Sequence, residues 1–252
     1  MLSRAHIIRR TVYGSCTTLI FIYIVFGVYR YYYQGYFEFY DSTDPIKPYN
    51  KYTTIHGGLI PVSGYKILQS VANPSLQRIH DLYTYLNENK ELKDYFILVP
   101  EDSYHITLTR LTNTLSIKES QLQKLEEEQE LLDKNNPYIK CVGKKLLLIE
   151  KNEIRLQIEL NNKYIDGYIK NLQKRWNNNF PKLITKHCTS FYIPLAYQYK
   201  DIPNQDILNR FNEALQQWYE MPIDVQLDPI EICSYSNLFA YEPILADYGE
   251  DD

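Results

Sequence analysis

The chain has 252 residues, a length that suits one anchored domain or two small ones. Its formal net charge of -4 conceals an uneven distribution, because residues 1–34 carry four arginines and no acid. Removing those four from 27 basic residues leaves 23 against 31 acidic ones, a net charge of -8 for the body. A body this acidic excludes a broad nucleic-acid surface, since phosphate backbones are bound by clustered Lys and Arg, but not a single nucleotide in a pocket.

An uncharged apolar run covers residues 12–29. As a helix, such a run spans about 27 Å, close to the thickness of the hydrocarbon core. Bulky tyrosines follow at 31–33 and 36, as in an interfacial aromatic belt, and no small-residue cleavage site is present. Residues 1–34 therefore predict an uncleaved, single-pass transmembrane anchor rather than a signal peptide.

The charges on either side of this run predict its orientation. Arg4, Arg9 and Arg10 precede it, and Glu38, Asp41 and Asp44 follow it. The positive-inside tendency places the N-terminus on the cytoplasmic or matrix side and the large domain across the membrane. Because an acid-free, Arg-bearing start is typical of mitochondrial import sequences, we expect the mitochondrial inner membrane, with the domain in the intermembrane space. A secretory-pathway membrane fits the charges almost as well.

The rest of the chain divides by composition and hydrophobic period. Residues 35–55 lack periodicity and contain prolines, which indicates a linker. A domain is expected over 56–246, followed by an acidic tail at 247–252. Strands are expected at 65–71, 95–99, 104–109, 138–142, 144–149, 153–160, 187–199 and near 225 and 232, with helices at 74–89, 116–133, 163–176 and 204–219. The helix at 116–133 is expected to open with a capping box at Ser116–Glu119. This mixed, hairpin-rich order predicts an α+β fold with antiparallel sheets.

The four cysteines are spread along the chain and form no metal-binding spacing. Cys16 falls in the apolar run, and the other three cannot all pair. We predict no required disulfide framework, no zinc site and no cofactor.

The strand expected at 104–109 carries the candidate chemistry. His105 and Thr107 lie two residues apart, so their side chains point to one face of a strand, while Ile106 and Leu108 point to the core. An imidazole beside a hydroxyl suits a phosphate, because the hydroxyl can hold a non-bridging oxygen while the imidazole transfers a proton. His105 and Thr107 are therefore candidate catalytic residues.

Four stretches resemble signatures of the 2H phosphoesterase (LigT-like) superfamily, in particular a little-characterised branch. They are the residues 57–61 (GGLIP), 98–107 (LVPEDSYHIT), 191–197 (FYIPLAY) and 227–235 (LDPIEICSY). The resemblance covers roughly 56–245 and implies a two-lobed fold with a pseudo-twofold cleft. Each lobe of such an enzyme gives one His-x-Thr/Ser: the histidines act as general base and general acid on a cyclic phosphodiester, and the hydroxyls hold phosphoryl oxygens.

The second motif departs from this pattern. Where the branch has His and Ser, this chain has Tyr192 and Pro194. Tyrosine titrates near pH 10 and is a poor base at neutral pH, although it can donate a hydrogen bond, and proline offers no hydroxyl. Losing one acid/base partner typically removes a factor of about 10²–10⁴ in rate.

A second His-x-Thr, formed by His187 and Thr189, lies just upstream of Tyr192. The odd offset of five puts His187 on the opposite face of a regular strand from Tyr192, and only a bulge or a shifted strand start would bring it into the cleft. Its alternating neighbours, Cys188 and Ser190, make a weaker core face. The sequence favours the Tyr192 register and leaves the His187 register open.

Two functions follow. In the favoured one, catalysis is lost and the domain is an accessory or structural subunit of a membrane complex, such as a respiratory-chain assembly. A residual pocket then holds a nucleotide or phosphate, with Tyr104, Tyr192 and Tyr197 as binding residues beside His105 and Thr107. The 25 tyrosines fit this modestly, since tyrosine is enriched at interfaces.

The alternative is an active 2′,3′-cyclic phosphodiesterase or RNA-end-processing enzyme. His105 and His187 would then be the acid/base pair, and Thr107 and Thr189 the phosphate holders.

Overall fold

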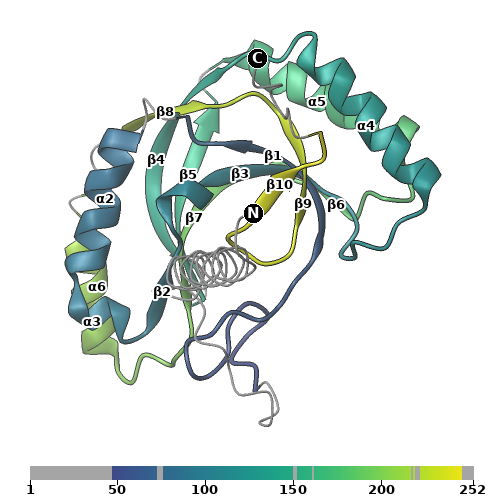
Figure 1. Ribbon diagram of the computed structural model, residues 1–252. Helices are drawn as coiled ribbons and strands as arrows, with labels where there is room; N and C mark the ends of the chain where they lie inside the picture. The colour runs from purple at the N-terminus through teal and green to yellow at the C-terminus, as the bar shows by residue number, and fades with distance from the viewer. Residues whose placement is uncertain are drawn as a thin grey trace, which may run out of the picture. The chain divides into compact units, whose positions relative to one another are not determined.

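The computed structural model describes residues 47–72, 76–149, 152–160, 162–216, 218 and 222–245 (Figure 1). The expected transmembrane anchor and the acidic tail lie outside these residues. No helix within the described ranges is long and apolar enough to cross a bilayer. The compact unit begins at Lys47, earlier than the expected 56, because isolated bridges join Pro48 to Thr54 and Thr53 to Leu59.

Two antiparallel sheets of five strands each form the centre of the described part, which confirms the predicted α+β antiparallel class. In spatial order, the first sheet contains β10 (Tyr241–Pro243), β9 (Glu231–Tyr235), β1 (Gly64–Ser70), β3 (His105–Arg110) and β6 (Lys186–His187). The second contains β2 (Phe96–Leu98), β7 (Phe191–Gln198), β5 (Glu153–Leu160), β4 (Ile139–Ile149) and β8 (Ile223–Leu227).

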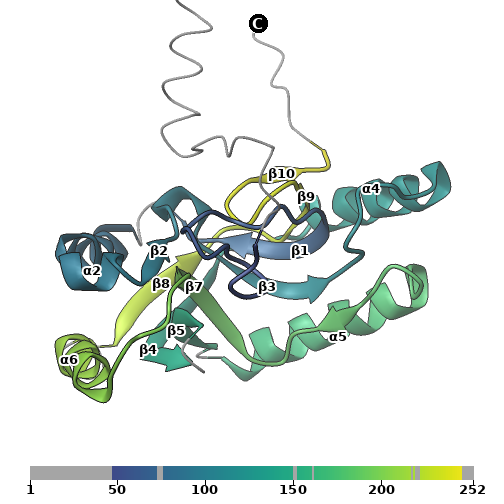
Figure 2. The same ribbon diagram turned by 90° about the horizontal axis from the view of Figure 1, so that it is seen from below.

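The helices flank the sheets in two groups. They are α2 (Leu76–Glu88), α3 (Lys90–Lys93), α4 (Glu119–Asp133), α5 (Lys163–Asn179) and α6 (Gln205–Gln216), with a short 3₁₀ turn η2 (Glu101–Ser103) before β3. Figures 1 and 2 show α2 and α6 on one side of the sheets, and α4 and α5 on the other. Trp176 of α5 and Phe211 of α6 are fully buried in the shared core.

The start of α4 differs from the expected capping box. The helix begins at Glu119, and the residue before it is Lys118 rather than Ser116. The side chain of Gln121 accepts a hydrogen bond from the Lys118 backbone N–H at 3.0 Å, which satisfies that donor from inside the helix. The hydrogen bond of a capping box is therefore present, but it lies two residues further along the chain.

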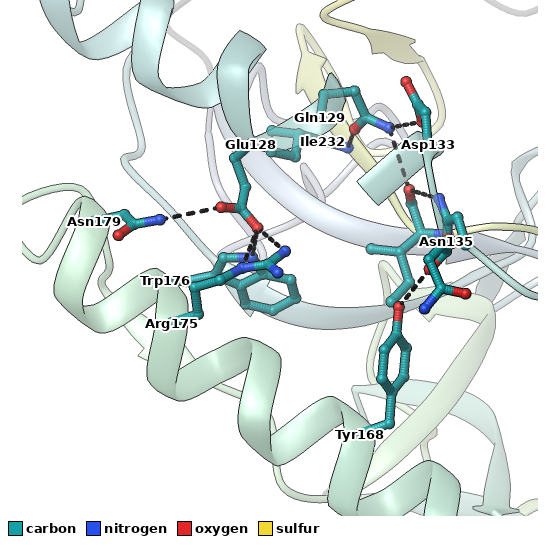
Figure 3. Close-up of polar contacts among 11 residues, drawn as sticks. Glu128, Gln129, Asp133, Asn135, Tyr168, Arg175, Trp176, Asn179 and Ile232 are labelled. Carbon is teal, nitrogen blue, oxygen red and sulfur yellow. Dashed lines mark hydrogen bonds and ion pairs between the residues drawn. The ribbon is translucent and has the colours of Figure 1, made fainter. Parts of the chain in front are cut away.

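Helices α4 and α5 are joined through a buried carboxylate, as Figure 3 shows. Glu128 of α4 is 2% exposed and accepts hydrogen bonds from the Arg175 guanidinium, the Trp176 indole (2.8 Å) and the Asn179 amide (3.2 Å) of α5. The neighbouring Gln129 accepts from the Ile232 backbone N–H of β9 at 2.7 Å. The Glu128 bonds hold α4 against α5, and the Gln129 bond holds α4 against the first sheet.

The strand pairs β1–β3 and β5–β7 repeat one another. In β1–β3, Lys66 lies opposite Arg110 and Ser70 opposite His105; in β5–β7, Glu153 lies opposite Tyr197 and Gln157 opposite Tyr192. Both pairs contain one extra residue at the same place, Leu108 in β3 and Leu195 in β7. The two halves therefore share one register, in which Tyr192 occupies the position of His105, and Pro194 that of Thr107.

Candidate functional site

A pocket of about 450 Å³ lies where the two halves meet. Residues of the first sheet line one wall: Lys66, His105, Thr107, Arg110, Tyr235 and Tyr241. Residues of the second sheet line the other: Glu153, Tyr192, Pro194 and Tyr197. Tyr52, from the segment before β1, packs on Tyr197 with ring centroids 4.9 Å apart. His105 and Thr107 thus line the same cavity as Tyr192 and Pro194, which occupy the equivalent positions of the other half.

His105 is held as a neutral ring with a defined tautomer. Its Nδ1 lies 2.7 Å from the backbone oxygen of Ser103, so Nδ1 donates a proton there and Nε2 carries the lone pair. Burial, and next the positive charge of Lys66, lower the pKa of His105 to about 3. An imidazole with so low a pKa is a weak proton acceptor at neutral pH.

Lys66 has its amine in aromatic surroundings. Its Nζ donates to the Tyr241 hydroxyl at 3.1 Å and lies 4.4 Å from the centroid of the Tyr235 ring and 4.9 Å from that of Tyr241. Burial, and next the charge of Arg110, lower the pKa of Lys66 to about 7. Within the described ranges no carboxylate forms an ion pair with this amine.

Arg110 brings a second positive charge to the same wall. It lies directly opposite Lys66 in the β1–β3 ladder, and its Nε is buried without a hydrogen-bond partner among the described residues. Thr107 lines the pocket beside it. Neither basic side chain forms an ion pair with a described carboxylate, since Glu153 of the same pocket pairs with Arg155. Together with the hydroxyl of Thr107, they provide the donors that a phosphate or another dianion requires.

The second half offers different chemistry. The Arg155 guanidinium stacks 4.2 Å from the centroid of the Tyr192 ring and pairs with Glu153 at 3.2 Å. Burial, and next the charge of Glu153, raise the pKa of Tyr192, so this phenol stays protonated. Pro194 supplies no hydroxyl. This half can donate a hydrogen bond from Tyr192 but brings no second imidazole to the pocket.

His187 and Thr189 are not brought together with His105. His187 pairs with Thr109 at the edge strand β6, where its Nδ1 lies 2.9 Å from the Thr109 hydroxyl, and neither His187 nor Thr189 lines the pocket. The expected continuous strand at 187–199 is divided into β6 and β7, with residues 188–190 between them. Because β6 continues the first sheet, His187 belongs to a different sheet from Tyr192.

Tyr104 and Tyr197, both expected to bind ligand, have different positions. Tyr197 lines the pocket. Tyr104 does not: it is 1% exposed and packs in the hydrophobic core, because it precedes His105 by one residue and points to the opposite face. Tyr104, expected to be a binding residue, therefore lies outside this pocket.

Four charged residues of the pocket are not predicted by the sequence patterns: Lys51, Lys66, Arg110 and Glu153. Arg110 lies an odd number of residues after His105, so a regular strand would point it away. The extra residue Leu108 reverses this alternation and turns Arg110 to the side of His105. A bulge of this kind leaves no clear mark in the sequence. Lys66 and Glu153 were hidden because they lie on partner strands whose register was unknown.

Comparison with known proteins informs on the fold. No family model and no curated protein matches the chain. A solved structure, that of ATU0111 from Agrobacterium tumefaciens, described as a conserved protein of unknown function, is similar with 13% identity and a TM-score of 0.56. The match covers 81% of this chain and 94% of that one. At this identity the similarity shows that the two chains share a fold and nothing about activity.

Proposed function

We propose that this protein is a catalytically inactive, 2H phosphoesterase-like protein that binds a phosphate-bearing ligand, such as a nucleotide, without cleaving it. The carrying observation is the pair of cations Lys66 and Arg110, which face a pocket that contains one imidazole instead of two. In the wider proposal, residues 1–34 anchor this binding domain in the mitochondrial inner membrane. There it acts as an accessory subunit of a membrane complex.

The proposed lack of activity is argued from the absence of an acid/base pair in the pocket. Acid/base cleavage of a phosphodiester needs one group to accept a proton and another to donate one. The pKa of His105 is about 3, and Tyr192 stays protonated, so the pocket has a weak base and no imidazole across from it. The missing hydroxyl at Pro194 also leaves one phosphoryl oxygen without its expected donor.

Binding rests on charge and shape. Lys66, Arg110 and Thr107 supply donors for a phosphate on the first wall, and hydrogen bonds to charged groups contribute about 1.5–3 kcal/mol each. Tyrosine rings at 52, 192, 197, 235 and 241 line the same cavity and offer flat apolar faces for a base or sugar. A nucleotide matches this combination of a cationic wall and aromatic walls.

The test compares binding and turnover in the full-length chain in mild detergent. Calorimetric titration with a nucleoside 3′-monophosphate should give saturable binding. Incubation with the matching 2′,3′-cyclic nucleotide should give no product above a protein-free control. Turnover abolished by His105→Ala would overturn the inactive assignment, and the absence of any saturable binding would overturn the ligand-binding role.

The membrane proposal has its own test. In alkaline carbonate extraction of mitochondria, the full chain should stay in the pellet, and a chain that lacks residues 1–34 should be released. Purification of the full chain in mild detergent should also recover partner subunits in fixed stoichiometry. Recovery of the full chain alone, or in the soluble fraction, would contradict the accessory-subunit proposal.

The alternative, hydrolysis by His105 and His187, gains no support from the geometry. The His187 ring is engaged by Thr109 on the edge strand, outside the pocket that His105 lines.

A further inference from the structure

Lys66 differs from an ordinary anion-binding lysine in what surrounds its amine. The titratable groups that face it are Arg110 and His105 from β3, Tyr235 and Cys233 from β9, Tyr241 from β10, and Cys188. Burial raises the pKa of Cys188, Cys233, Tyr235 and Tyr241, so none of these is negatively charged near neutral pH. No described neighbour therefore stabilises the ammonium form by an opposite charge.

A lysine in such surroundings carries a free lone pair at neutral pH. With its pKa lowered to about 7, the Lys66 side chain is a neutral amine there far more often than an exposed lysine is. Desolvation beside a second cation is a known way to activate a lysine as a nucleophile toward carbonyl groups. Lys66 also lines a cavity of about 450 Å³, large enough for a small metabolite.

From this placement we propose that Lys66 forms a reversible imine with small aldehydes or ketones that carry a phosphate, while Arg110 and Thr107 hold the phosphate. This rests on the proposed anion site and narrows its ligand class. The Lys66 nitrogen adds to the carbonyl carbon, the carbonyl oxygen takes up a proton, and the nitrogen loses one. The resulting carbinolamine then expels its hydroxyl as water, leaving a C=N bond. One amine and one carbonyl thus give one imine and one water, with no change in oxidation state.

The Tyr241 hydroxyl can assist this step. It lies 3.1 Å from the lysine nitrogen, and its raised pKa keeps it protonated, so it can donate a hydrogen bond to the carbonyl oxygen during addition. His105, whose Nε2 carries a lone pair, also lines the cavity. Both Tyr241 and His105 are neutral near pH 7, which is the form in which each would act.

Reductive trapping tests the proposal. Full-length protein in detergent is incubated near pH 7 with glycolaldehyde phosphate and cyanoborohydride, and the modified peptides are quantified by mass spectrometry. We expect Lys66 to be modified at least tenfold faster than the exposed Lys124. Glycolaldehyde without the phosphate should lose most of this preference. An excess of inorganic phosphate should slow trapping at Lys66 and leave Lys124 unchanged.

Variants and a matched ligand separate the possible outcomes. In Arg110→Gln the preference for Lys66 should fall toward that of Lys124, and Lys66→Arg should remove the trapped product. Trapping at Lys66 no faster than at Lys124 in the wild-type chain would overturn the imine proposal. If 2-hydroxyethyl phosphate, which has no carbonyl, still binds by calorimetry in that case, the anion site stands alone. If it does not bind, both proposals fail.

Discussion

Lys66 and Arg110 lie directly opposite each other on β1 and β3, two basic side chains in one rung of an antiparallel ladder. Like charges in facing positions destabilise a sheet. The equivalent rung of the other half, Glu153 and Tyr197, has no such repulsion. A bound anion would offset the repulsion between these two side chains when both are charged, which makes the rung the centre of the proposed site.

The first prediction concerns pH. Sulfate keeps two negative charges over the whole range, so any change in its affinity reports on the protein. Lys66 is charged below its pKa of about 7 and neutral above it, whereas His105, with a pKa of about 3, stays neutral throughout. The apparent Kd for sulfate should therefore rise about tenfold between pH 6 and pH 8. Calorimetric titrations on full-length protein would measure it.

The control for this prediction is Lys66→Arg, which keeps a positive charge at every pH in that range. Its sulfate affinity should be nearly flat between pH 6 and pH 8. An equally steep dependence in this variant would show that a different group titrates.

The second prediction reverses the altered motif. The double substitution Tyr192→His with Pro194→Ser restores an imidazole and a hydroxyl at the positions that match His105 and Thr107. Hydrolysis of a 2′,3′-cyclic nucleotide should rise by about 10²–10⁴-fold over the wild-type background. A chromatographic product assay checks it. Adding His105→Gln should abolish the gain; a wild-type chain as active as the double variant would refute the account.

The third prediction places His187 outside the site. His187→Ala removes the contact with Thr109, which should cost about 0.5–1.5 kcal/mol of unfolding free energy. The Kd for phosphate should stay within about twofold of the wild-type value. Thr109→Val is the matched variant, because it removes the same contact from the other strand. A tenfold loss of affinity in His187→Ala would return His187 to the binding machinery.

The fourth prediction concerns the contact between α4 and α5. Glu128→Ala leaves the buried indole N–H of Trp176 without its acceptor and removes the partner of Arg175. Since the Arg175 side chain is 39% exposed and can be solvated, the loss should be about 1–3 kcal/mol of unfolding free energy. Denaturant unfolding measures it, with the exposed Glu130→Ala as a control expected to change little. Equal effects of the two substitutions would contradict the role given to Glu128.

The sequence predicted the elements better than it predicted the site. Alternation of Ile106 with its neighbours was enough to place the β3 strand, and the apolar Ile193 and Leu195 favoured the Tyr192 register that the ladder shows. The alternation pattern could not place Arg110, because the bulge at Leu108 changes the face of every later residue in the strand. Lys66 could not be found either, since its place beside Arg110 depends on pairing between strands that lie 44 positions apart in the sequence.

The same limit explains the division of the strand expected at 187–199. Alternation is a local signal and does not tell which sheet a strand joins. Lys186–His187 pairs with β3 in the first sheet, and Phe191 begins the pairing with β5 in the second. Only the tertiary structure separates these two segments.

Calorimetric titration of full-length protein with inorganic phosphate at pH 6.5 tests the central claim most directly, with wild type, Arg110→Gln and the exposed Lys124→Gln side by side. We predict saturable binding to the wild type and to Lys124→Gln with the same Kd, and a loss of about tenfold to a hundredfold in Arg110→Gln, since one charge-assisted hydrogen bond is removed. Equal affinity in all three proteins, or no binding to the wild type, would contradict an anion site formed by Lys66 and Arg110.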